Sequence, residues 1–215
     1  MKKQKVLLLG ATGLVGSIVQ EKIANSQLNL EIFSFVRNKD TNRPSTVMSK
    51  TIDFKNLKQE VETLKPNVII CSLGTTLKKA GSKKAFRNVD YELPLNAAHG
   101  LGRESRFILI SSIGADKKSN FFYLRTKGEL ESALKRFDFK LLIYRPSILS
   151  GGRSEKRVLE SLWLSFVSFL PSWKSFEPLR PTNPIDIADD ILSELGRSQV
   201  KKIVIKQGHK VKEIS

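Results

Sequence analysis

A tyrosine and a lysine lie four residues apart in the stretch YLRTKGELE, which runs from Tyr123 to Glu131. Residues with this spacing share one face of a helix, so the Tyr123 phenol and the Lys127 ammonium can converge on one point. A free tyrosine has a pKa near ~10, and a neighbouring ammonium favours the phenolate and lowers that pKa. The pair could therefore exchange a proton with a bound substrate. A core tyrosine beside a solvated lysine would have the same spacing, so other residues must decide between the two interpretations.

Two serines supply a hydroxyl group close to this pair in the sequence. Ser111 and Ser112 end the apolar run in ILISSIGAD, directly before the segment that carries Tyr123. A hydroxyl at the end of a strand can donate a hydrogen bond to a substrate oxygen while the tyrosine transfers a proton. The order of serine, tyrosine and lysine therefore favours the chemical interpretation of the pair.

Three glycines follow the first apolar run of the chain, in VLLLGATGLVG. Glycines here allow a tight turn, and the helix that follows offers free N–H groups to a pyrophosphate. The spacing is G-x-x-G-x-x-G rather than G-x-G-x-x-G, and an ordinary strand–helix turn would also use glycine. The position directly after the first strand favours a dinucleotide site. The predicted cradle consists of Gly10, Thr12, Gly13, Leu14, Val15 and Gly16.

The second apolar run ends in FSFVRNKD, where Arg37 stands at the place at which NAD enzymes usually carry an acidic residue. A guanidinium fits a 2′-phosphate bidentately, so NADP(H) is the expected cofactor and NAD(H) is the alternative. Arg37 could also belong to a solvated basic loop. The residues predicted to line the adenine and the ribose are Asp53, Phe54, Leu73, Gly74 and Thr75. Asp53 would serve equally well as the cap of the next helix.

The elements that must position these residues alternate between short apolar runs and helical patterns. Such alternation predicts a parallel sheet covered on both faces. We therefore expect an α/β, doubly wound, three-layer α/β/α fold with a mostly parallel sheet, formed by residues 1–215 as a single domain. The predicted strands are Val6–Leu9, Glu31–Val36, Thr51–Asp53, Val68–Leu73, Phe107–Ile110, Lys140–Ile143 and Ile203–Ile205. The predicted helices are Leu14–Ala24, Leu57–Leu64, Lys83–Leu101, Phe122–Phe137 and one that begins at Ile185.

The pattern changes after Ser150, where the polar loop SGGRSEKR precedes an apolar helix with Trp163 and Phe166 and then a proline-rich section. In open α/β sheets the substrate crevice lies outside the carboxyl ends of the strands. Residues 151–184 are therefore the predicted substrate wall or lid. If it were exposed, the aromatic helix at 157–173 would instead offer a surface to a protein partner or a membrane.

The chain carries 37 Lys+Arg against 21 Asp+Glu, a net charge of +16 that attracts anionic ligands and surfaces. No nucleic-acid-binding motif accompanies this charge, so nucleic acid is not the expected partner. The most apolar stretch, Leu162–Leu170, is shorter than the ~20 residues of a membrane span. Cys71 is the one cysteine, which excludes an internal disulfide and suits a reducing cytoplasm. His99 and His209 are isolated in the sequence, so no metal site is predicted.

Taken together, these motifs resemble the atypical short-chain dehydrogenases/reductases, and most closely the Tat-interacting-protein-like oxidoreductase branch of that superfamily. The matching pieces are GATGLVG, SLGTTLKKAGSKKAF followed by VDY, SSIGADKKSNFFYLRTKGELE, and YRPSILSGGRSEKR. They extend from about residue 6 to residue 157, with weaker likeness beyond. The long block from serine to lysine is the specific part, whereas the glycine motif only indicates the superfamily.

The resemblance implies a Rossmann fold that binds NADPH and uses a serine–tyrosine–lysine triad. Carried onto this sequence, Tyr123 is the general acid/base and Lys127 is its activator and a ribose contact. Ser112 is the donor to the substrate oxygen. It is preferred to Ser111 by analogy with the extended dehydrogenases, and Ser111 is then expected to contact the cofactor.

Two further features follow from the same resemblance. The segment Arg145, Pro146 and Ser147, after the sixth predicted strand, resembles the part that lines the nicotinamide end of the cofactor. The large substrate domain of extended relatives is missing, and so is a secure match for their fourth polar catalytic residue. Asn88 is a candidate for that residue, but it also fits an ordinary helix surface.

The sequence thus predicts an NADPH-dependent oxidoreductase that reduces a carbonyl or related group of a small molecule. A different class stays open, namely an NADPH-responsive regulatory or interaction protein with an idle triad. A nucleotide-sugar epimerase or dehydratase is a third option, which normally needs a larger carboxy-terminal domain. By analogy with related folds, the helices Lys83–Leu101 and Tyr123–Phe137 could pair in a homodimer.

Overall fold

Eight strands form one sheet in the computed structural model, which describes residues 3–38, 42–149, 181–197, 201–208 and 211–214. Their order across the sheet is β3-β2-β1-β4-β5-β6-β7-β8. Neighbouring strands are parallel except for the antiparallel pair β7 and β8. The strands are β1 (Gln4–Leu9), β2 (Leu30–Val36), β3 (Val47–Thr51), β4 (Val68–Cys71), β5 (Arg106–Ile110), β6 (Lys140–Arg145), β7 (Ile203–Gln207) and β8 (Lys212–Ile214).

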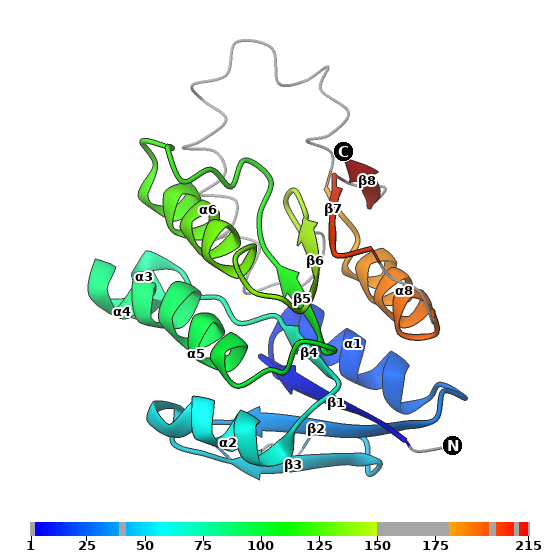
Figure 1. Cartoon of the computed structure of the whole chain (residues 1–215). Helices are drawn as coiled ribbons and strands as arrows, with labels where there is room; N and C mark the ends of the chain where they lie inside the picture. Colours follow the sequence, from blue (N-terminus) through cyan, green and yellow to red (C-terminus); the bar gives the residue numbers. More distant parts are fainter. Residues whose placement is uncertain (1–2, 39–41, 150–180, 198–200, 209–210, 215) are drawn as a thin grey trace.

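Helices cover both faces of this sheet and complete three layers (Figure 1). Helices α2, α5 and α6 pack on one face, and α1 and α8 pack on the other. The helices are α1 (Leu14–Ala24), α2 (Leu57–Leu64), α3 (Leu77–Ala80), α4 (Lys83–Arg87), α5 (Leu93–His99), α6 (Phe122–Leu134) and α8 (Pro184–Leu195). A 3-10 turn, η1 (Phe54–Asn56), leads into α2, and a π-helical turn, η2 (Asn88–Glu92), joins α4 to α5.

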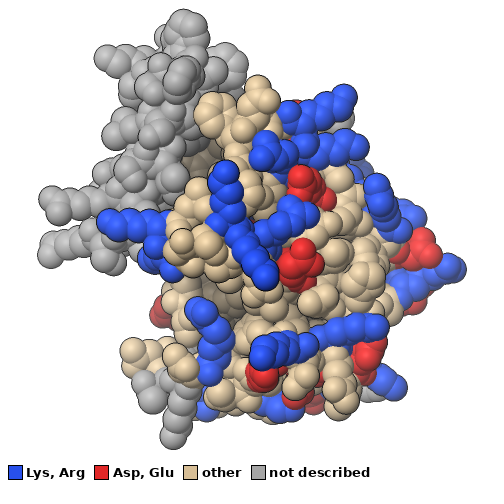
Figure 2. Space-filling view, turned by 90° about the vertical axis from the view of Figure 1, so that its left-hand side faces the viewer, with Lys and Arg blue, Asp and Glu red and all other residues tan. Residues whose placement is uncertain are grey.

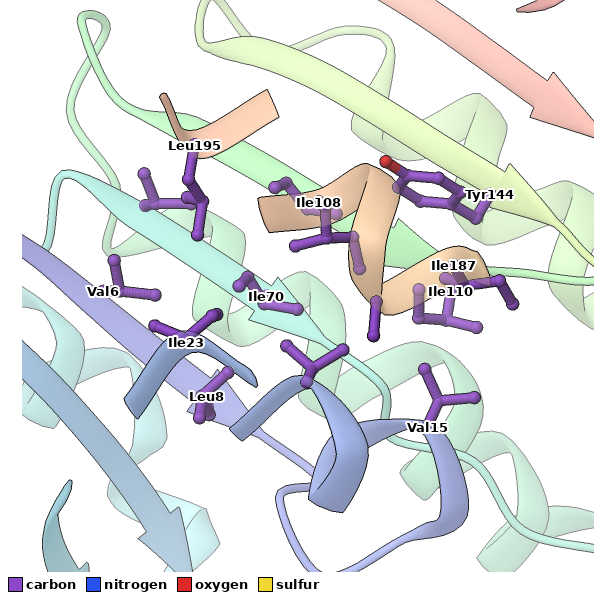
Figure 3. Packing of buried hydrophobic residues seen from close by; sticks show 14 of the residues in the cluster. Val6, Leu8, Val15, Ile23, Ile70, Ile108, Ile110, Tyr144, Ile187 and Leu195 are labelled. Atoms are coloured by element: carbon purple, nitrogen blue, oxygen red, sulfur yellow. The ribbon is translucent and has the colours of Figure 1, made fainter. Parts of the chain in front are cut away.

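The core is divided by the sheet into two clusters, because successive side chains of a strand point to opposite faces. Val6 and Leu8 of β1 belong to the cluster that also contains Ile23 of α1 and Ile187 of α8 (Figure 3). Leu7, on the same strand, packs in the other cluster with α2, α5 and α6. Burial on both faces explains why the central strands are nearly continuous apolar runs.

Strand β1 lies inside the sheet, with β2 on one side and β4 on the other. Leu9, its last residue, is aligned with Phe35 of β2 and Cys71 of β4. The strand order therefore reverses at the carboxyl end of β1, the point where ligands bind in open α/β sheets. The doubly wound, mostly parallel, three-layer fold predicted from the sequence is confirmed.

The structure differs from the predicted elements in a few places. The third strand is Val47–Thr51 rather than Thr51–Asp53, because the chain has left the sheet by Asp53 and begins η1 there. The predicted helix Lys83–Leu101 is divided by η2, and the short elements α3 and β8 were not predicted. The predicted substrate wall or lid falls mainly on residues 150–180, and these, with the aromatic helix at 157–173, lie outside the described residues. The single-domain assignment stays a prediction.

Candidate cofactor and proton-transfer site

The glycine-rich turn after β1 is built so that two of its residues must be glycine. Gly10 has φ +85°, and a Cβ on it would lie 2.7 Å from the backbone of Ser72. A Cβ on Gly16 would lie 2.1 Å from the Gly10 carbonyl oxygen. The turn therefore packs directly against the residue that follows β4, and no side chain covers its backbone at Gly10 and Gly16. This cradle is the feature that a dinucleotide pyrophosphate needs, so the residues present fit such a cofactor.

Helix α1 begins at the same turn. Gly13 caps it without a side chain, and no side chain accepts a hydrogen bond from its first N–H groups. The helix amino terminus thus directs its N–H groups and the positive end of its dipole to the switch point. Ser72 closes the turn from β4, with its hydroxyl 3.1 Å from the carbonyl oxygens of both Leu9 and Gly10. Ser72 was not singled out in the sequence, because a serine after a strand has no special pattern.

The residues expected around the adenine end lie along the same edge of the sheet. Arg37 follows β2 and is exposed, as a contact to a 2′-phosphate requires. The Asp53 carboxylate accepts a hydrogen bond from the backbone N–H of Lys55 at 3.0 Å and so caps η1. Phe54 is partly buried against the core. Asp53 was predicted either to contact the adenine or to cap the next helix, and the structure shows the cap.

Lys127 is buried and paired with a carboxylate that sequence reasoning missed. Its side chain is 4% exposed, and its Nζ lies 2.8 Å from Oδ1 of Asp90, which is fully buried in η2. The other oxygen of Asp90 accepts the backbone N–H of Thr75 at 2.9 Å. Burial pulls the pKa of Lys127 down, but the Asp90 carboxylate, the Tyr123 phenol and the Cys71 thiol outweigh it and raise that pKa above the usual lysine value. Lys127 is therefore an ammonium at every physiological pH.

Tyr123 stands one turn before Lys127 on α6 and is partly buried. Its ring meets the fully buried ring of Phe86 edge-on, with centroids 5.9 Å apart and an angle of 61° between the planes. Phe86 lies on α4, next to η2, so one helical segment supplies both the wall behind the phenol and the counter-ion of the lysine. The solvated-lysine interpretation of this pair is wrong, because Lys127 is buried.

The two serines after β5 have different surroundings. The Ser111 hydroxyl is buried and donates to Glu131 of α6 at 2.6 Å. Glu131 also accepts three hydrogen bonds from the guanidinium of Arg145, at 3.0, 3.2 and 2.5 Å. Ser112 is partly buried and donates to the adjacent carbonyl of Ile113 at 3.1 Å. Ser111 and Arg145 are thus engaged in a structural network. Ser112 can exchange a local hydrogen bond for one to a substrate, which favours it as the donor.

Gly128, next to Lys127, lets the loop that carries Ser111 and Ser112 pack closely on α6. The loop after β5 crosses α6 at Gly128, where a Cβ would lie 2.2 Å from backbone atoms of Asp116 and Lys117. The Asp116 N–H also donates to the Leu124 carbonyl at 3.2 Å. The motif YLRTKG therefore contains a second positional requirement, which helical periodicity does not reveal.

The segment after β6 returns to the same edge. The Ile113 N–H donates to the Pro146 carbonyl at 2.8 Å, and the Ser147 N–H donates to the Thr182 hydroxyl at 3.0 Å. Gly74 and Thr75 lie above the Asp90–Lys127 pair, since a Cβ on Gly74 would be 3.9 Å from the Lys127 ammonium. The structure thus places the predicted residues from the glycine turn to Ser147 along the carboxyl edge of one sheet. Asn88 is exposed, and the inward-facing polar residue of that turn is Asp90.

Sequence comparisons identify the relatives of this chain. The HIM1 family model matches residues 26–170. Protein HTATIP2 of Rattus norvegicus is 34% identical over 183 residues, which is 81% of this chain and 75% of the relative. Protein FMP52 of Lodderomyces elongisporus, named as mitochondrial, is 33% identical over 209 residues, or 91% of this chain and 85% of the relative.

Solved structures show the same fold at low sequence identity. A short-chain dehydrogenase/reductase family oxidoreductase from Burkholderia thailandensis superposes with a TM-score of 0.71 at 15% identity, over 98% of this chain and 93% of that one. A dTDP-4-dehydrorhamnose reductase from Bacillus anthracis, in complex with NADP, gives a TM-score of 0.64 at 14% identity, over 96% and 75% of the two chains. Among the described residues, no helix is both long and apolar enough to cross a membrane.

Proposed function

This chain belongs to the HIM1 family and is an atypical short-chain dehydrogenase/reductase of the Tat-interacting-protein type, and from that premise we propose that it is an NADPH-dependent oxidoreductase. Its substrate is a small molecule with a carbonyl or a related unsaturated group. The observation that carries the proposal is the buried ammonium of Lys127 one turn from Tyr123, at the switch point of the sheet. A buried lysine whose charge is held by one specific carboxylate is a candidate for a functional site.

The cofactor site extends along the carboxyl edge of the sheet. The turn from Gly10 to Gly16 would hold the pyrophosphate on the amino terminus of α1. Arg37 would pair with the 2′-phosphate, which is the basis for preferring NADPH to NADH. Leu73–Thr75 and Lys127 would lie along the nicotinamide ribose. When bound, the cofactor supplies the hydride.

The residues of this chain supply the proton and the charge stabilisation. Tyr123 donates a proton to the substrate oxygen as its negative charge develops. The Lys127 ammonium lowers the cost of the resulting phenolate by its charge. The Ser112 hydroxyl donates a hydrogen bond to the same oxygen. A positioned general acid contributes about 10²- to 10⁴-fold to the rate. Removal of the Tyr123 hydroxyl should therefore lower turnover by a factor in this range.

Replacement of Tyr123 tests the proposal. We expect Tyr123→Phe to lower NADPH oxidation with a carbonyl panel by at least about 100-fold, since the general acid is removed, while NADPH affinity by fluorescence titration stays within about twofold. Tyr91→Phe is the matched control. Tyr91 of η2 lies against the guanidinium of Arg87, whose central carbon is 4.1 Å from the ring centre, and it is not one of the proposed site residues. Unchanged turnover in Tyr123→Phe would remove the tyrosine from the mechanism.

A regulatory role for NADPH binding is the second candidate. The relatives HTATIP2 and FMP52 carry names that state no reaction. Such a protein would bind NADPH through the same cradle and leave the triad idle. It would bind NADPH as tightly as an enzyme does, yet oxidise none of it with any carbonyl compound. The activity panel with the wild-type protein therefore separates the two candidates.

We also propose an oligomeric state, a protein-binding surface and a cellular location. The helical segments Lys83–Leu101 and Tyr123–Phe137 are proposed to pair in a homodimer, which sedimentation analysis of the purified chain would detect. The aromatic helix at 157–173 lies outside the described residues and is kept as a proposed protein-binding surface. A reducing compartment such as the cytoplasm is proposed because Cys71 is a buried free thiol, and cell fractionation would test this location.

A further inference from the structure

Asp90 and Lys127 form an ion pair that is buried in the protein interior. Both side chains are almost completely excluded from solvent, and their charged atoms are 2.8 Å apart. Removing two charges from water is costly, and a hydrophobic pair of similar volume is often as stable or more stable. Stability alone therefore does not explain the pair, and its position beside Tyr123 points to the chemistry of the site.

The backbone is shaped to bring Asp90 to this place. The helix that starts at Lys83 continues to His99, but it widens into the π-helical turn η2 at Asn88–Glu92. Such turns within α-helices frequently occur at functional sites. The Thr75 N–H holds one carboxylate oxygen at 2.9 Å, which leaves the other directed to Lys127. Gly74 and Thr75 are also the residues proposed to lie along the cofactor ribose.

Asp90 is the one carboxylate that the described residues place against the Lys127 ammonium. The other titratable groups that act on Lys127 are Tyr123 on its own helix and Cys71 at the end of β4. Burial raises the pKa of the Cys71 thiol to about 11, so this thiol is neutral under physiological conditions. The negative charge that keeps a buried lysine protonated thus comes from Asp90.

We propose that Asp90 is a positioning residue that fixes the place and the positive charge of Lys127, and thereby sets the alkaline limit of cofactor binding and of proton transfer by Tyr123. The effect on cofactor binding and proton transfer rests on the proposed function. The effect of Asp90 on the charge of Lys127 concerns the folded chain alone, so the two claims can fail separately.

The direction of the effect follows from the charges. In Asp90→Asn the lysine stays buried without a counter-ion, and a fully buried lysine can lose about 3–5 units of pKa. The proposed reduction needs a charged lysine, so the earlier loss of the Lys127 proton moves the alkaline limit to lower pH.

The chain offers a matched control on the opposite face of the sheet. Asp190 of α8 accepts hydrogen bonds from Lys206 and Tyr144, each at 2.5 Å, and so repeats the combination of carboxylate, lysine and tyrosine. Lys206 is also buried, but it keeps a second partner in Glu194 at 2.8 Å. Asp190→Asn therefore removes the same group from a similar cluster without leaving a lysine unpaired.

The test measures NADPH affinity by fluorescence between about pH 6 and pH 9 for the wild type, Asp90→Asn, Asp90→Glu and Asp190→Asn. Relative to the wild type, Asp90→Asn should lose at least about tenfold more affinity at pH 9 than at pH 6, because Lys127 loses its proton. Asp90→Glu keeps the charge and should show no such loss, and neither should Asp190→Asn. An unchanged pH profile in Asp90→Asn, or an equal shift in Asp90→Glu, would overturn the proposal. With a carbonyl substrate that the wild type reduces, the alkaline limb of kcat/KM should move in the same way.

Urea unfolding supplies a readout that needs neither cofactor nor turnover. The unfolded chain binds a proton at Lys127 up to its ordinary pKa, whereas folded Asp90→Asn releases it earlier. Its urea midpoint, relative to that of the wild type, should therefore rise from pH 6 to pH 9. A difference in urea midpoint that does not change with pH would contradict the effect of Asp90 on the charge of Lys127.

If the wild type binds no NADPH but this rise appears, the proposed function fails while the role of Asp90 in holding the charge of Lys127 stands. If Asp90→Asn does not fold, Asp90→Glu still decides, since a shifted pH profile in that charged variant would contradict the proposal.

Discussion

Arg37 carries the choice between the two nicotinamide cofactors at the scale of a single residue. Its side chain is exposed after β2, at the edge where a ribose bound on the glycine turn would place its 2′ position. A hydrogen-bonded ion pair with a charged partner contributes about 1.5–3 kcal/mol, and each 1.4 kcal/mol is a factor of about ten in affinity. The 2′-phosphate is the one group of NADPH that would make this contact and that NADH lacks.

We therefore expect Arg37→Gln to weaken NADPH binding by about 10- to 100-fold and to leave NADH binding within about twofold. Fluorescence titration of the purified variant with each nucleotide is the measurement. Arg103→Gln serves as the control, because Arg103 is also exposed but pairs with Asp138, away from the carboxyl ends of the strands. Equal losses for both nucleotides would show that Arg37 acts on a shared part of the cofactor.

Some residues of the site were recognisable in the sequence and others were not. The glycines, Tyr123 and Lys127 belong to local motifs, and the order of these motifs together with the family resemblance indicated their roles. Asp90 lies in the matching piece VDY, but its role was missed, because an aspartate in a helical pattern resembles a solvent-facing residue and its partner lies on another helix. Glu131 was hidden in the same way, since its partners Ser111 and Arg145 come from two different strand ends.

At the scale of elements, Gly128 joins the loop after β5 to the helix of the triad. Glycine inside a helix usually costs about 1 kcal/mol relative to alanine, so its presence in α6 needs a reason. The reason is the backbone of Asp116 and Lys117, which occupies the space of a Cβ. The same loop carries Ser112, and its distance from Tyr123 therefore depends on this glycine.

We expect Gly128→Ala to destabilise the chain by about 1–3 kcal/mol in urea unfolding, although alanine is the better helix former. The folded fraction should also oxidise NADPH more slowly, because the displaced loop moves the Ser112 hydroxyl. Ala133→Gly, on the same helix, is the comparison, and it should cost about 1 kcal/mol without a change in turnover per folded molecule. A stabilising effect of Gly128→Ala would mean that the loop moves aside freely.

The elements themselves were predictable where burial is strong. Strands β1, β4 and β5 are almost fully buried, so their apolar runs predicted them closely. Strand β3 lies at the edge of the sheet, and only Val47 of its five residues is buried. It was placed four residues late because its polar residues leave no pattern. The turn η2 was also missed, since a π-helical turn has the same composition as the α-helix around it.

At the scale of the whole molecule, the net charge of +16 acts on every anion that approaches. Figure 2 shows Lys and Arg spread over one face, with fewer Asp and Glu among them. This face includes the exposed lysines of α3 and α4, which follow directly after the loop Leu73–Thr75. A nicotinamide dinucleotide phosphate is a polyanion, so the field should guide it to the carboxyl edge.

We expect the association rate of NADPH, followed by stopped-flow fluorescence, to fall at least about tenfold between about 50 mM and 500 mM salt. The dissociation rate should change much less, because it reflects short-range contacts. A neutral osmolyte at matched viscosity is the control. An association rate that is independent of salt would leave the surface charge without a role in cofactor capture.

The two ends of residues 150–180 are attached to neighbouring points of the scaffold. Leu149 forms a parallel bridge with Thr182, and the Ser147 and Thr182 hydroxyls lie 2.9 Å apart. Strands β6 and β7, on either side of this junction, are adjacent in the sheet. An exchange of the intervening chain would therefore leave the order of the strands unchanged. Under the proposal that this chain forms the substrate wall, such exchanges would change substrate preference among related proteins and leave the glycine turn and the Asp90–Lys127 pair as they are.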